Sequence, residues 1–112
     1  MSAGLWEEID ETMRLLDKAL REAKSRGDRY VAAEAAYYSA KARAAFSLKE
    51  DGYPVTFIET VIKGVPSVAE KMTEYHAAQV EYENAREARN VYKKKLDTLR
   101  EQYAREWGEA KQ

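Results

Sequence analysis

The amino-acid sequence predicts an all-α protein: an antiparallel hairpin of two long helices with a short helix at the tip, assembling into a dimeric or higher helical bundle. Apolar residues recur every three or four positions from Leu5 to Leu48 and again from Val68 to Trp107. Fewer than 20 residues join these stretches, and they hold both prolines of the chain. Long helices joined by so short a segment pack most economically side by side. We therefore expect one helical-hairpin domain, residues 1–112.

The first long helix is predicted over about residues 5–50. Gly27 interrupts the pattern, but a lone glycine costs a helix only about 1 kcal/mol relative to alanine, and no proline accompanies it. One continuous helix with a weak point at Gly27 is favoured, and a break there stays open. The helix should end at Asp51-Gly52, because glycine accepts the left-handed conformation and Pro54 cannot continue the hydrogen-bond ladder. The expected buried stripe is Ile9, Met13, Leu16, Leu20, Ala23, Tyr30, Ala33, Tyr37, Ala40, Ala44 and Leu48.

The tip, residues 51–66, should contain a short helix over about residues 56–63. Thr56 and the glutamate three residues later have the spacing of a capping box, in which each side chain caps the other's backbone. Ser67 and Glu70 repeat that spacing just after Pro66, and a long periodic segment follows. The second long helix is therefore predicted over about residues 67–108.

The stretch from residue 31 to residue 46 is apolar around nearly its whole circumference. Apart from the tyrosine hydroxyls, its polar residues are Glu34, Ser39, Lys41 and Arg43. A helix of this kind needs more than one packing neighbour, and a hairpin partner supplies only one. The sequence thus predicts a homo-oligomer. The expected interface consists of Ala33, Ala36, Tyr37, Tyr38, Ala40 and Ala44.

The residue types needed for catalysis or metal binding are scarce. The chain has no cysteine and one histidine, His76, with a threonine three residues before it where a di-iron bundle needs glutamate. Its glutamates fall on the solvated side of the helices, where burial cannot raise a pKa for acid or base chemistry. We expect no enzyme, no catalytic or metal-binding residues and no cofactor. No stretch approaches the roughly 20 apolar residues of a membrane span and no signal sequence is recognisable, so a cytoplasmic protein without membrane contact is expected.

Two surfaces are candidates for binding a partner. The tip gathers Tyr53, Pro54 and Phe57 at one end of two long helices, where an exposed aromatic residue often serves recognition. In the alternative reading Phe57, with Ile58, Val61 and Ile62, only closes the hairpin core. The second surface is a basic row on the last helix that could face the phosphates of nucleic acid or a nucleotide, or could form salt bridges with neighbouring carboxylates. It consists of Arg86, Arg89, Lys93 and Arg100, and a similar row on the first helix contains Arg14, Lys18 and Arg21.

Three segments carry a resemblance to a known group of proteins. They are Leu48-Lys-Glu-Asp-Gly-Tyr-Pro-Val-Thr-Phe-Ile58, the turn at Lys63-Gly64, and Arg105-Glu106-Trp107 near the C-terminus. The chain resembles, from about residue 30, small uncharacterised helical proteins encoded in the early region of phages and prophages of Gram-positive bacteria. The resemblance implies an accessory protein that binds an unknown host or phage macromolecule, and it implies no site residues. Nucleic-acid binding in replication or recombination, and sequestration of a nucleotide-like defence signal, remain the alternatives.

Overall fold

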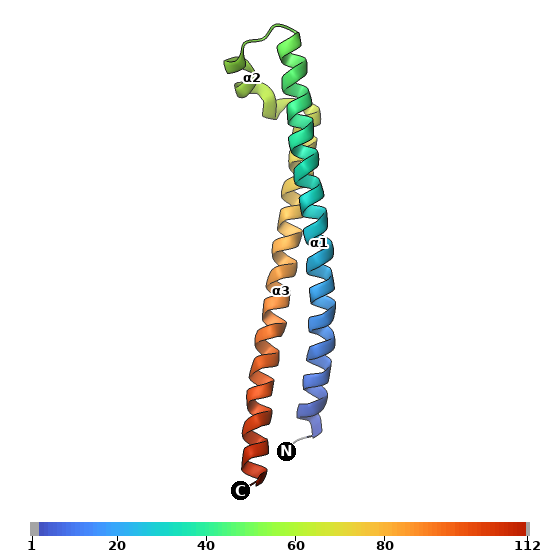
Figure 1. The fold of residues 1–112 in the computed structure, drawn as a ribbon, viewed down its shortest axis with the longest axis vertical. Coiled ribbons are helices and arrows are strands. Elements are labelled where there is room, and N and C mark those ends of the chain that lie inside the picture. Colours follow the sequence, from blue (N-terminus) through green and yellow to red (C-terminus); the bar gives the residue numbers. More distant parts are fainter. Residues whose placement is uncertain (1–2, 112) are drawn as a thin grey trace. The chain divides into compact units, whose positions relative to one another are not determined.

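The computed structural model describes residues 3–111, and its elements are all helical (Figure 1). Helix α1 spans Ala3–Glu50, α2 spans Val55–Val61, a single 3-10 turn, η1, spans Ile62–Gly64, and α3 spans Pro66–Lys111. No strand occurs between residues 3 and 111. The predicted all-α class and the hairpin of α1 against α3 are confirmed, and each long helix extends two or three residues beyond its predicted outer end.

The internal contacts of the chain divide it into two compact units, each built from both long helices. Unit 1 combines α1 up to Ser25 with α3 from Glu83 onward. Unit 2 contains residues 26–82, with the rest of α1, the tip and the first part of α3. The single helical-hairpin domain stays a prediction, and both units are built from the same two continuous helices.

The core of unit 1 is a small cluster of leucine and isoleucine side chains contributed by both helices. Leu5 and Ile9 of α1 pack with Leu96 and Leu99 of α3, and each is at most 7% exposed. Tyr103 packs against this cluster, and its ring lies 5.9 Å from that of Trp6. The start of α1 therefore meets the end of α3, as an antiparallel hairpin requires.

The buried stripe of α1 in unit 1 differs from the predicted one. Met13 and Leu20 are 47% and 45% exposed, whereas Thr12 and Ala19 are buried. Two helices stay in contact over this length only if the contact positions average 3.5 residues per turn. Both the expected and the observed series alternate steps of three and four. The observed one steps by four from Leu5 to Ile9 and then by three to position 12, so it takes the residues before Met13 and Leu20 and keeps the others. The resulting series is Leu5, Ile9, Thr12, Leu16, Ala19 and Ala23.

In unit 2, α1 continues through Gly27, which settles the break left open by the sequence. A Cβ atom at this position would lie 3.2 Å from Cε1 of Tyr82, closer than nearly all such contacts. The absence of a side chain at Gly27 therefore makes room for the tyrosine ring. Tyr82 stacks on Tyr30 at 5.7 Å, Tyr30 on Tyr75 at 5.6 Å, and Tyr75 on Tyr37 at 5.6 Å, forming a tyrosine series that alternates between the two helices.

The end of α1 is closed by a Schellman turn. The amide of Gly52 donates to the carbonyl of Lys49, and the amide of Tyr53 donates to the carbonyl of Leu48. Gly52 has φ = 91°, a left-handed conformation that residues with a Cβ atom rarely adopt. The predicted helix end at Asp51-Gly52 is confirmed.

The two predicted capping boxes are wrong by one or two residues. The N-cap of α2 is Pro54, without a side-chain capping hydrogen bond, so Thr56 lies inside the first turn. At the start of α3 the carbonyl of Val65 accepts the amides of the residues at positions 68 and 69, and Pro66 is the first helical residue. Proline is suited to that position because its fixed φ is already helical and it has no amide to satisfy. Ser67 is therefore the second residue of α3 and not its cap.

Candidate functional site

The tip exposes a small apolar surface, here called the tip patch, made of Tyr53, Val55 and Phe57. These side chains are 46%, 60% and 43% exposed. The rings of Tyr53 and Phe57 stack with their centroids 4.8 Å apart and their planes 20° apart. The tip patch thus contains a stacked, solvent-exposed aromatic pair.

The same short helix anchors the tip through its other face. Ile58 and Ile62 are buried and Val61 is half-buried, so these three residues close the core of unit 2, as one reading of the sequence predicted. Phe57 does not join them, although the core-closing reading included it. Pro54, with an extended backbone at φ = −70° and ψ = 154°, is exposed and turns the chain from the Schellman turn into α2. The tip therefore carries one anchored face and one exposed aromatic face.

The basic row of α3 has three exposed members at intervals of seven residues, Arg86, Lys93 and Arg100. Arg89 departs from the row, because it is half-buried and its Nε is enclosed without a hydrogen-bond partner. Within residues 3–111, no ion pair described for the structure involves Lys93 or Arg100. Salt bridges thus do not account for those two side chains.

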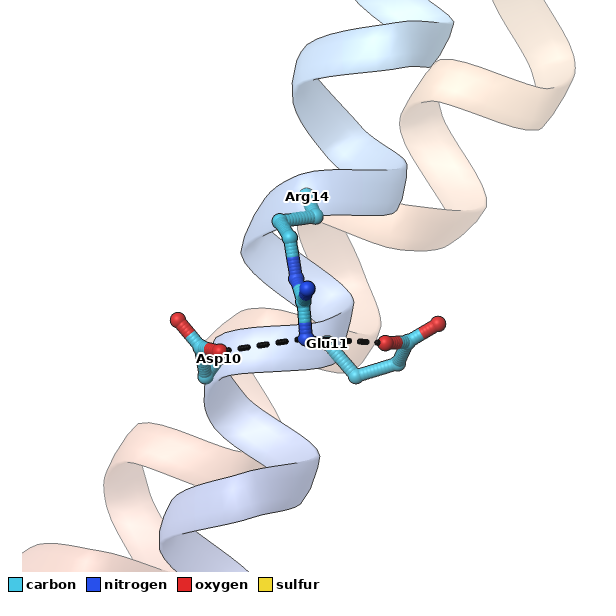
Figure 2. A network of polar contacts seen from close by, with 3 residues as sticks. All are labelled: Asp10, Glu11 and Arg14. Carbon is cyan, nitrogen blue, oxygen red and sulfur yellow. Dashed lines mark hydrogen bonds and ion pairs between the residues drawn. The ribbon is translucent and has the colours of Figure 1, made fainter.

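Two members of the similar row on α1, Arg14 and Arg21, are instead paired with acids of their own helix. Arg14 Nη2 lies 3.2 Å from Asp10 and 3.2 Å from Glu11, and Figure 2 shows the guanidinium between the two carboxylates. Arg21 pairs with Asp17 one turn away. All five side chains are exposed, so these pairs contribute a few tenths of a kcal/mol each, about 0.2–1. This part of α1 is a solvated outer face.

The predicted oligomer interface does not lie on one free surface. Tyr37 and Ala40 are 7% and 6% exposed, because both pack inside unit 2. Their assignment to an interface is therefore wrong, since the hairpin already buries them. Ala44 borders a groove of about 380 Å³ that Arg43, Leu48, Val65 and Ser67 also line. Ala33 and Ala36 are half-buried, and Tyr38 is exposed.

Sequence reasoning missed a second apolar series on the opposite side of α1, here called the outer stripe. It consists of Val31, Ala35, Tyr38, Ala42 and Ala45, in alternating steps of four and three residues. Val31 and Tyr38 are 67% and 56% exposed. The signal was present, because a helix that is apolar all round carries two such series and only one can face α3.

One polar contact is enclosed among the tyrosines of unit 2. The hydroxyl of Tyr75 donates to Oε2 of Glu34 at 3.0 Å. Hydrogen bonding to Tyr30 and Glu34, together with the negative charge of Glu34, raises the pKa of Tyr75 above its ordinary value. His76 is exposed beside Tyr75, with ring centroids 5.5 Å apart. This contact orders the series and offers no reactive group.

The described residues contain no group of three or more His, Asp or Glu side chains placed to hold a metal ion. Nor does any helix within that part of the chain have the apolar length needed to cross a bilayer. Comparison with models of known protein families, with curated proteins and with solved structures gives no match.

Proposed function

We propose that this chain is a non-enzymatic accessory protein of the phage type, which self-associates and uses its tip patch to bind a protein of the phage or its host. The observation that supports it most directly is the exposed, stacked pair of Tyr53 and Phe57 beside Val55. Aromatic side chains of this kind are enriched at the centres of protein interfaces, because they bury a large area at a low cost in conformational entropy.

The local backbone adds to this argument. The Schellman turn fixes Tyr53, and the burial of Ile58 and Ile62 fixes α2, which carries Phe57. A surface that is already ordered loses little further entropy on binding, so more of the contact energy appears as affinity. The tip therefore has the properties of a docking site.

The tip patch is tested by capture of partners from host lysate with the tagged protein, followed by mass spectrometry. Tyr53→Ala combined with Phe57→Ala should reduce capture of the specific partner at least tenfold while helicity and oligomeric state stay unchanged. Val91→Ala is the matched control, because Val91 is 59% exposed and belongs to unit 1, whereas the tip belongs to unit 2. Undiminished capture by the tip variant would overturn the assignment.

The exposed members of the basic row support nucleic-acid binding as a second candidate. Lys93 and Arg100 take no part in the ion pairs described above, and seven-residue spacing aligns them with Arg86 on one side of α3. Phosphate contacts make binding weaken steeply with salt. Binding of DNA or RNA that falls with rising salt, and that is lost when Arg86, Lys93 and Arg100 are all replaced by Glu, would favour this function over the tip.

A further inference from the structure

The outer face of α1 changes from charged to uncharged along the helix. In unit 1 the outward heptad positions are charged, including Asp10, Glu11, Arg14 and Asp17. From residue 31 to residue 46 the equivalent outward positions carry no charge at all. They are Val31, Ala32, Ala35, Tyr38, Ser39, Ala42, Ala45 and Phe46.

This uncharged face is open to solvent. Val31, Tyr38 and Phe46 are 67%, 56% and 65% exposed. Along the outer stripe alanines follow Val31 and Tyr38, and Phe46 lies beside the end of that stripe. Large side chains alternating with alanine give the knobs and holes that a second helix can fill. A solvated helix face would carry charges here, as the same helix does in unit 1.

We propose that the occupant of this face is the same segment of a second copy of the chain, packed antiparallel about a two-fold axis that passes beside Tyr38. The proposal rests on the self-association contained in the proposed function, and it does not depend on the tip patch. The contact is isologous, so each residue and its opposite exchange roles between the two copies.

Charge placement favours the antiparallel arrangement. Asp28 lies three residues before the outer stripe and Lys49 four residues after it, so the two charges are nearly equidistant from Tyr38. Antiparallel packing sets Asp28 of each copy opposite Lys49 of the other. Parallel packing would set each of these charges opposite its own kind, which is unfavourable.

Side-chain size leads to the same arrangement. In the antiparallel register Phe46 of one copy lies opposite Val31 and beside Ala32 of the other, so a large ring meets smaller side chains. A hollow of about 280 Å³ bordered by Phe46, Lys49 and Glu50 lies at this end of the stripe, where the second copy's helix would pass. Parallel packing would instead bring two Phe46 rings together.

Light scattering behind a sizing column tests the association. The wild-type chain should have the mass of a dimer at tens of micromolar, and Ala42→Glu, a change at an exposed helical position, should give a monomer with unchanged helicity. Val80→Glu is the matched control, because Val80 is also exposed in unit 2 but lies on α3, so it should stay dimeric. A monomeric wild type, or a dimeric Ala42→Glu variant, overturns the proposal.

Cross-linking tests the direction, using the fact that the chain has no cysteine of its own. Antiparallel packing sets position 35 opposite position 42, so oxidising a mixture of Ala35→Cys and Ala42→Cys chains should give the mixed disulfide. Neither variant alone should cross-link, because its cysteines would be seven residues apart, about 10 Å along the axis. A disulfide between two Ala35→Cys chains overturns the antiparallel arrangement. The Tyr53→Ala, Phe57→Ala variant should remain dimeric, so failure of the tip assignment and failure of this interface are separate results.

Discussion

Replacing Thr12 by valine should stabilise the protein. Thr12 is 1% exposed, and its Oγ1 is buried without a hydrogen-bond partner. A buried hydroxyl that lacks a partner costs about 1–3 kcal/mol in protein mutational data. Valine has nearly the same shape and a similar helix propensity, so the change removes this cost without opening a cavity. We expect the free energy of unfolding to rise by about 1–2 kcal/mol.

Urea denaturation followed by far-UV circular dichroism measures this change. Wild type and variant must be compared at one protein concentration, because association with a second copy adds to apparent stability. The midpoint should move to higher urea with an unchanged slope, since the surface exposed on unfolding is the same. In a thermal scan the rise should be roughly 4 °C per kcal/mol for a chain of this size.

Thr12→Ser is the matched control, because it keeps the hydroxyl and removes one buried methyl group. Serine should lower the free energy of unfolding by about 1 kcal/mol. If valine leaves the midpoint unchanged or lowers it while the slope stays constant, then the hydroxyl has a partner in solution and the reasoning is refuted.

Three further outcomes test other parts of the fold by the same denaturation assay. Helix propensity alone would make Gly27→Ala more stable by about 1 kcal/mol, but we expect no such gain because the new Cβ crowds Tyr82. In a Tyr82→Ala background the same substitution should give the gain. Gly52→Ala should cost about 1–2 kcal/mol because φ is positive there, whereas Gly108→Ala, with open space around it, should cost nothing. Because the pKa of Tyr75 is raised in the folded state, the stability that its hydroxyl contributes is complete below the unfolded-state pKa of 10.0 and is lost at higher pH. The difference in free energy of unfolding between wild type and Tyr75→Phe should therefore narrow from about pH 10 upward.

The helices and the position of the tip could be predicted because periodicity, Gly52 and the two prolines are local signals. The positions of α1 that contact α3 in unit 1 could be predicted only to within one residue. Met13 is more hydrophobic than Thr12, yet Thr12 is buried, because the contact series that steps from Leu5 to Ile9 continues by three residues to position 12. A sequence read for apolar residues alone therefore assigns the wrong neighbour wherever a polar residue occupies a contact position.

The role of Gly27 could not be predicted, because the residue that needs its space, Tyr82, lies far away in the sequence. The exposed face of α1 was predicted to exist but not located. A segment that is apolar all round offers two equivalent series, and only the position of α3 decides which of them is buried. Tyr37 and Tyr38 are adjacent in sequence, but the position of α3 leaves Tyr37 buried and Tyr38 exposed.

The tyrosine series has a consequence for spectroscopy. Both tryptophans, at positions 6 and 107, belong to unit 1, whereas six of the eight tyrosines belong to unit 2. Fluorescence excited at the red edge, where only tryptophan absorbs, therefore follows unit 1, and the near-UV dichroism of the stacked tyrosine rings follows mainly unit 2. The native chain thus carries a separate optical probe in each half, and the two unfolding curves coincide only if the halves melt as one cooperative block.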